Sequence, residues 1–197
     1  HYRMNNNVIR CMILGDINVG KTYLFNILSG KSTQQSYYDP SIGVDVSLIK
    51  ITSSNNVKIN MLLYDCSGDN IFTNIIETYL FDIDIFLLVY NDNKVLSIEW
   101  IKYLLENKFK KYKIHKKFLV LINNTDLTPN PYKTIPDKII NLIYKYCPIY
   151  IETDFKKLNK RSMLECIQGP IDTIALNRRF KNNSINYIHE IDINCCF

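Results

Sequence analysis

The chain has 197 residues, of which 47% are hydrophobic and 22% charged, and its formal net charge is +5. This length gives room for one domain with a full core and argues against a second domain. The mild positive charge suits an acidic membrane surface and argues against a nucleic-acid partner. No apolar run approaches the roughly 18 residues of a membrane-spanning helix, and the N-terminus lacks the layout of a secretory signal.

Four of the six cysteines are scattered through apolar or motif sequence, with neither a C-x-x-C pair nor metal-ligand spacing: Cys11, Cys66, Cys147 and Cys166. This distribution predicts reduced thiols and a cytosolic protein rather than a disulfide framework. We interpret residues 1–3, which precede Met4, as a cloning remnant, and we expect residues 1–7 to be disordered.

Strand-like and helix-like runs alternate along the chain. Apolar or alternating runs predict strands at residues 8–14, 44–52, 57–64, 85–90, 118–122 and 148–151. Helical spacing predicts helices after residue 22, at 97–109, at 137–146 and from about 157. The alternation predicts an α/β fold with a mostly parallel six-stranded sheet and helices on both faces. The strands at 44–52 and 57–64 are expected to form a hairpin, which gives the sheet one antiparallel edge strand.

Two features shape the C-terminal part of the chain. Gly169-Pro170 falls inside the last helical run, where proline removes a backbone hydrogen bond, so we expect a kink or a break there. Beyond Leu176 the sequence becomes polar and asparagine-rich. We therefore expect a globular domain over residues 8–176 and a flexible tail over 177–197.

The first chemical motif is the pattern G-x-x-x-x-G-K-T, which typically cradles phosphates with backbone N–H groups. It consists of Gly15, Asp16, Ile17, Asn18, Val19, Gly20, Lys21 and Thr22. An ordinary strand-to-helix turn with an exposed lysine is the alternative interpretation. Because an apolar strand precedes the motif and a helical run follows it, the sequence favours a site for a nucleoside triphosphate with magnesium.

Two further motifs follow buried strands. Asp65 ends one strand and would hold magnesium through water, while the N–H of Gly68 would face a γ-phosphate. Asp126 ends the motif Asn123-Asn124-Thr125-Asp126. Its carboxylate would accept two hydrogen bonds from guanine, which adenine cannot donate, and would therefore select GTP over ATP.

With these motifs in this order, the chain resembles a Rab-type small GTPase of the Ras superfamily over about residues 8–176. Trp100 also lies where Rab proteins carry a tryptophan in the third helix. Four segments are similar to the family motifs IGVDF, WDTAGQE, NKxD and ETSAK: Ile42 to Val46, Tyr64 to Asn70, Asn123 to Asp126, and Glu152 to Lys156.

The resemblance implies a role for each matching residue. Lys21 would contact the β- and γ-phosphates, and Thr22 and Ser41 would offer hydroxyls to magnesium. Asn123 and Asp126 would read the guanine. Further residues would lie around the base, and the backbone of one of them, Phe155, would face its O6. These residues are Asn124, Thr153, Asp154, Phe155 and Lys156.

Several positions depart from the family pattern. Asp69 replaces the glutamine that orients the attacking water, and Ile17 replaces a small residue beside the γ-phosphate, so we expect slow intrinsic hydrolysis. Asn124 replaces the lysine that packs along the guanine. Gln34 stands where the family has an aromatic residue near the start of switch I, and Tyr37 or Tyr38 would substitute for that residue. Lower nucleotide affinity than is usual for the family is therefore expected.

The last residues include the adjacent pair Cys195-Cys196, which resembles the double-cysteine ending of Rab proteins with one residue appended. Incidental exposed thiols are the alternative interpretation, because lipidation signals are short. Two prenyl chains would hold the protein on a bilayer, with attraction to anionic lipid from Arg178, Arg179 and Lys181.

The resulting hypothesis is a GTP/GDP switch with Mg²⁺ that regulates vesicle trafficking from the cytoplasmic face of an endomembrane. The resemblance implies an exchange factor, a GTPase-activating protein, and a Rab escort protein with its prenyltransferase. It also implies effectors bound through the switch loops, around Tyr37 to Val46 and Asp69 to Tyr79. Two rival hypotheses remain: a pseudo-GTPase that acts as an interaction scaffold, and a P-loop enzyme that uses ATP on small molecules.

Overall fold

A computed structural model describes residues 8–32, 43–68, 77–114, 117–125, 137–147 and 149–182. Its six-stranded sheet has the order β2-β3-β1-β4-β5-β6. Only the pairing of β2 with β3 is antiparallel among the strand pairs of these ranges, so the predicted fold class is confirmed. The strands are β1 (Val8–Gly15), β2 (Val44–Thr52), β3 (Lys58–Cys66), β4 (Ile85–Tyr90), β5 (Phe118–Asn124) and β6 (Ile149–Thr153).

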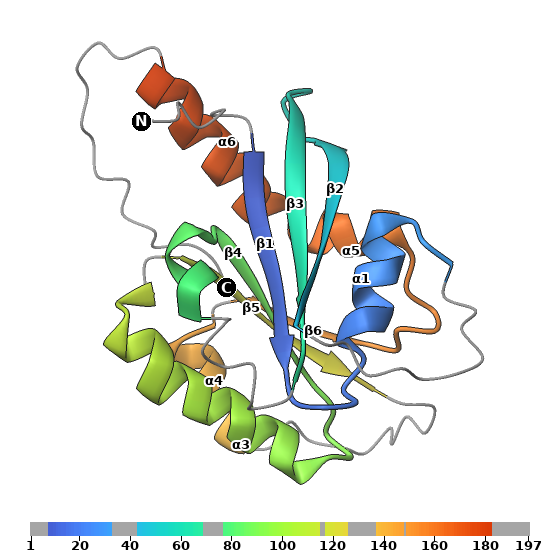
Figure 1. Cartoon of the computed structure of the whole chain (residues 1–197), viewed down its shortest axis with the longest axis vertical. Helices are drawn as coiled ribbons and strands as arrows, with labels where there is room; N and C mark the ends of the chain where they lie inside the picture. Colours follow the sequence, from blue (N-terminus) through green and yellow to red (C-terminus); the bar gives the residue numbers. More distant parts are fainter. Residues whose placement is uncertain are drawn as a thin grey trace.

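Helices cover both faces of the sheet. Figure 1 shows α3 and α4 on one side and α1 and α5 on the other. The helices are α1 (Lys21–Ser29), η2 (Leu80–Asp82), α3 (Val95–Tyr103), which continues into η3 (Leu104–Phe109), α4 (Asp137–Lys145), α5 (Lys160–Cys166) and α6 (Gln168–Asn182).

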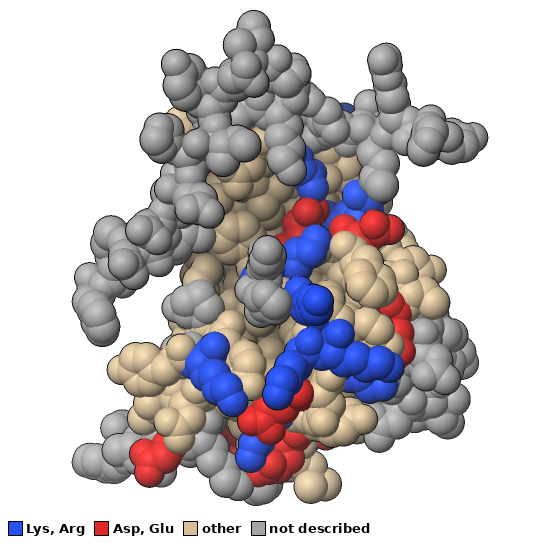
Figure 2. Space-filling view, turned by 90° about the vertical axis from the view of Figure 1, so that its left-hand side faces the viewer, with Lys and Arg blue, Asp and Glu red and all other residues tan. Residues whose placement is uncertain are grey.

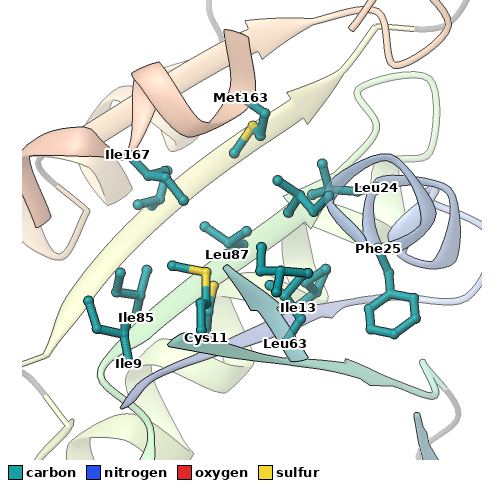
Figure 3. Packing of buried hydrophobic residues seen from close by; sticks show 14 of the residues in the cluster. Ile9, Cys11, Ile13, Leu24, Phe25, Leu63, Ile85, Leu87, Met163 and Ile167 are labelled. Atoms are coloured by element: carbon teal, nitrogen blue, oxygen red, sulfur yellow. The ribbon is translucent and has the colours of Figure 1, made fainter. Parts of the chain in front are cut away.

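The core beneath α1 and α5 explains why the central strands are apolar throughout. Figure 3 shows Leu24 of α1 and Met163 of α5 packed over Ile13 and Leu87 of the sheet. On the opposite face a second cluster of buried residues packs under α3, η3 and α4. Strands covered on both faces read as continuous hydrophobic runs, and each fully buried large side chain contributes about 1.5–3 kcal/mol. β1 and β5, which end at the predicted site, are therefore packed on both faces.

The C-terminal helical region confirms one expectation and corrects another. The helix breaks at Ile167, and Pro170 lies in the first turn of α6, where a missing N–H costs little. The sequence predicts a flexible tail from residue 177, whereas α6 continues to Asn182. Arg178 anchors the extension: its Nη2 lies 2.8 Å from both carboxylate oxygens of Asp84, and its Nη1 donates a hydrogen bond to the carbonyl of Val8.

Positive charge is interspersed with negative charge on the surface. In the view of Figure 2, Lys and Arg side chains form a band with Asp and Glu side chains among them. Among the described residues, Lys108 pairs with Glu77, which also accepts a hydrogen bond from the Tyr112 hydroxyl. Such pairing is typical of a solvated face. None of the helices in the described ranges has the length and apolar character that a bilayer-spanning segment requires.

Candidate nucleotide-binding site

The phosphate-loop motif occupies the turn between β1 and α1, as the sequence predicts. Gly20 caps α1 with a φ of 100°, and Asn18 has a φ of 60°, so two residues of the loop adopt left-handed backbone angles. Asparagine tolerates this region better than most residues. Because α1 begins at Lys21, its first N–H groups point toward the loop, and this arrangement favours an anion.

Three carbonyl groups of the loop are held by side chains. Lys21 Nζ donates to the carbonyl of Asp16 over 2.7 Å, and Asn124 Nδ2 donates to the carbonyl of Val19 over 3.0 Å. Lys94, which immediately precedes α3, donates its ammonium to the carbonyl of Asn18. In a trans peptide the N–H points opposite to the C=O, so these contacts also fix the directions of loop N–H groups.

Two glycines of the site allow close packing that a side chain would prevent. A Cβ on Gly20 would lie 2.8 Å from Nδ2 of Asn124 and 3.0 Å from the ring of Phe155. A Cβ on Gly68 would lie 2.6 Å from Lys21 Nζ and 2.6 Å from the carbonyl carbon of Asp16. The backbone after β3 therefore approaches the phosphate loop directly.

Lys21 is buried beneath the loop, and only 7% of its residue surface is exposed to solvent. Burial lowers the pKa of Lys21 from 10.5 to about 8, against the opposing influence of Asp65 and Asp16. Desolvation disfavours the ammonium form, and a nearby anion restores it. Asp65 is fully buried at the end of β3. The site thus holds a lysine whose charge would be stabilised by a bound phosphate.

The two asparagines of the third motif point to opposite faces of β5. Asn123 Nδ2 donates to Asp92 over 3.1 Å, and the buried Asn123 Oδ1 accepts no hydrogen bond within the described ranges. Asn124 instead joins the phosphate loop to the segment after β6, because its Oδ1 accepts the N–H of Phe155 over 3.3 Å. The structure thus brings Asn124 to the loop, and contact of Asn123 with guanine stays a prediction.

The segment after β6 lies beside the loop. Phe155 is buried in the core under α1, and its N–H, expected to face a base, bonds to Asn124. Asp154 Oδ1 accepts the N–H of Lys156 over 2.9 Å, which forms a tight turn after Thr153. The structure therefore brings this segment to the site, with Lys156 exposed.

The remaining candidates divide by location. Thr22 lies in the first turn of α1 and Ile17 on the rim of the loop, where it is 46% exposed. Other predicted site residues lie outside the described residues: Tyr38, Ser41, Asp69, Asp126, Cys195 and Cys196. Lys94 was missed from the sequence because it belongs to no motif. Cys11, Cys66 and Cys147 are buried free thiols, and Cys166 is an exposed one.

Comparison with known proteins adds to this geometry. A family model described as Roc, the Ras of Complex domain of DAPkinase, matches residues 10–126, more than half of the chain. The match begins in β1 and includes the loop, Asp65, Gly68 and the asparagine motif. The chain is a divergent Rab-type member of the Ras superfamily of small GTPases.

Individual Rab proteins match at modest identity. The Rab-34 protein of Mus musculus is 31% identical over 127 residues, which cover 64% of this chain and 48% of that protein. RabO of Dictyostelium discoideum is 27% identical over 189 residues, covering 91% of this chain and 85% of that protein. This Rab-type chain therefore spans about half the length of Rab-34 but most of the length of RabO.

Proposed function

We propose that the chain is a Mg²⁺-dependent GTP/GDP switch that regulates vesicle trafficking. The observation that carries the proposal is the phosphate loop with Lys21 buried beneath it and Gly68 packed against it. The family to which the chain belongs is one of guanine-nucleotide-binding domains. The donor set fits such a ligand, because the loop combines a helix N-terminus, a desolvated lysine and backbone N–H groups.

In this proposal each residue has a defined task. Lys21 balances phosphate charge, and the hydroxyls of Thr22 and Ser41, with Asp65 acting through water, would hold magnesium. When bound, the ion would supply further positive charge to the phosphates. Gly68 brings its N–H to the terminal phosphate, and Asp126 selects guanine.

Hydrolysis is expected to be slow in this proposal. Ile17 stands on the rim of the loop and would restrict water and any activator side chain. Asp69 would place a carboxylate near an anionic phosphate instead of a neutral amide. A single-turnover assay should show faster hydrolysis in Asp69→Gln than in wild type. Equal or slower turnover in the variant would contradict this assignment.

Partner binding is proposed at the surface beside the switches. Val46 and Leu48 lie on the same face of the edge strand β2 and are 52% and 58% exposed. Tyr64 and Tyr79 stand next to each other with ring centroids 5.8 Å apart. We propose that effectors contact this apolar surface together with the switch loops, and that exchange and activating factors act on the same region.

Membrane attachment is proposed through prenylation of Cys195 and Cys196 by a Rab escort protein and its prenyltransferase. Arg178 drops out of the proposed lipid-attracting set, because Asp84 and the carbonyl of Val8 engage its guanidinium. Mass spectrometry of protein purified from a eukaryotic host would show one or two prenyl additions. Unmodified cysteines would leave the pair as incidental thiols.

A nucleotide-independent scaffold is the second candidate. Hydrogen bonds within the loop favour this candidate, because they occupy donors that would otherwise bind phosphate. The N–H of Ile17 donates to Asp16 Oδ1 over 2.8 Å, and Lys21 donates to the Asp16 carbonyl. Nucleotide retained on the purified protein would argue against it. Competition between GTP and ATP, with Asp126→Asn as the control, separates the switch from an ATP-using enzyme, which would show no guanine preference.

A further inference from the structure

A lysine from outside the nucleotide motifs contacts the phosphate loop. Lys94 stands 76 positions along the chain from Asn18, yet its ammonium donates a hydrogen bond to the Asn18 carbonyl. No motif of the sequence includes Lys94. The contact crosses from the turn after β4 to the loop after β1, and these two strands are neighbours in the sheet.

The backbone of Lys94 is fixed by a closed set of hydrogen bonds. Its N–H donates to the carbonyl of Asn91 over 2.9 Å, and its own carbonyl lies 2.6 Å from the Ser97 hydroxyl. The same hydroxyl accepts the Asn91 N–H over 3.2 Å. Asn91 and Ser97 are both buried. Lys94 is therefore presented to the loop from a preorganised turn rather than from a mobile surface.

The contact determines how the loop peptides are oriented. Lys94 holds the Asn18 carbonyl, so the N–H of Val19 in the same trans peptide points to the opposite side. Asn124 holds the next carbonyl, that of Val19, over 3.0 Å. Two successive peptides of the loop are thus aligned by side chains from two other elements. Orienting donors before a ligand arrives lowers the entropic cost of binding.

The distribution of positive charge around the loop also supports a role for Lys94 in phosphate binding. The motif Asn123-Asn124-Thr125-Asp126 contains no lysine, so β5 brings no ammonium of its own to the loop. The Lys94 ammonium, which lies at the Asn18 carbonyl, therefore brings a positive charge to the loop from outside the motifs, and a polyphosphate would stabilise that charge.

We propose that Lys94 is a positioning residue of the nucleotide site, which holds the Asn18 peptide for phosphate binding and supplies the cation that the third motif lacks. This inference rests on the proposed function. It predicts that loss of the Lys94 ammonium weakens the retention of nucleotide, whereas a guanidinium at the same place preserves it.

The test measures release of a fluorescent GDP analogue from the purified full chain, with magnesium present, together with thermal unfolding of the nucleotide-free protein. Lys94→Met should release the analogue about tenfold faster, as expected for loss of one charge-assisted hydrogen bond. Lys94→Arg should stay within about threefold of wild type. Lys102→Met, an exposed lysine of α3, is the matched control and should not change the rate.

The outcomes separate the inference from its foundation. Faster release in Lys94→Met, with an unchanged melting temperature of the nucleotide-free protein and rescue by Lys94→Arg, supports a positioning role. Release at the wild-type rate overturns it. Release that is equally fast in both variants, with a lowered melting temperature, overturns it in favour of a purely structural contact. A wild-type chain that binds no GDP would overturn the proposed function itself.

Discussion

Replacing Lys21 with methionine should stabilise the nucleotide-free protein while abolishing its response to nucleotide. Burial lowers the pKa of Lys21 from 10.5 to about 8, and each pKa unit corresponds to about 1.4 kcal/mol. The buried ammonium therefore costs about 3 kcal/mol at neutral pH. Lys21→Met removes this cost and loses one hydrogen bond to the Asp16 carbonyl, worth about 1 kcal/mol. The net gain is about 2 kcal/mol.

For a domain of this size the gain corresponds to a rise in Tm of about 4–8 °C, measured by thermal unfolding of stripped protein at pH 7. The pKa shift also predicts how stability depends on pH. Between pH 8 and 10.5 the unfolded state binds more protons than the folded state, so the free energy of unfolding of the wild type rises with pH in that window. The advantage of Lys21→Met is full below about pH 8 and shrinks toward pH 10.5. A variant less stable than wild type at pH 7 would refute the reasoning.

Three further predictions concern single contacts. Gly68→Ala should lower the free energy of unfolding by about 1–3 kcal/mol, because the added Cβ would lie 2.6 Å from the Asp16 backbone. The variant should also lose more affinity for GTP than for GDP, since the Gly68 N–H is proposed to face the terminal phosphate; equal losses of affinity would contradict this. Arg178→Met should cost about 2 kcal/mol in urea unfolding, and a double-mutant cycle with Asp84→Asn should reveal coupling, whereas additive effects would exclude it. Asn124→Ala should cost about 1–2 kcal/mol and speed nucleotide release, since it breaks two hydrogen bonds; an unchanged release rate would count against the bridge.

The fold was predictable because the local signals agree with each other. The strands are apolar or alternate between apolar and polar residues, and Asp and Asn residues lie at or directly after several strand ends. Expected and observed strand bounds agree within two residues for all six strands. The end of the last helix was not predictable from composition, because the ion pair of Arg178 with Asp84 joins residues 94 positions apart.

The site was predictable where a motif is contiguous. The loop from Gly15 to Thr22 lies where the pattern requires, since its chemistry and its geometry come from one segment. The contact of Asn124 with the loop was harder to predict, because alternation along β5 sends Asn123 and Asn124 to opposite faces and the contact partner lies 105 positions away. Lys94 acts through a contact between distant segments, so no local pattern indicates it.

The most direct test of the account is a calorimetric titration of the nucleotide-free protein with GDP in a buffer that contains magnesium. ATP serves as the competing ligand. The account predicts saturable binding of one GDP per chain that GTP displaces and ATP does not. Absence of uptake at millimolar GDP, or equal displacement by ATP, would contradict it.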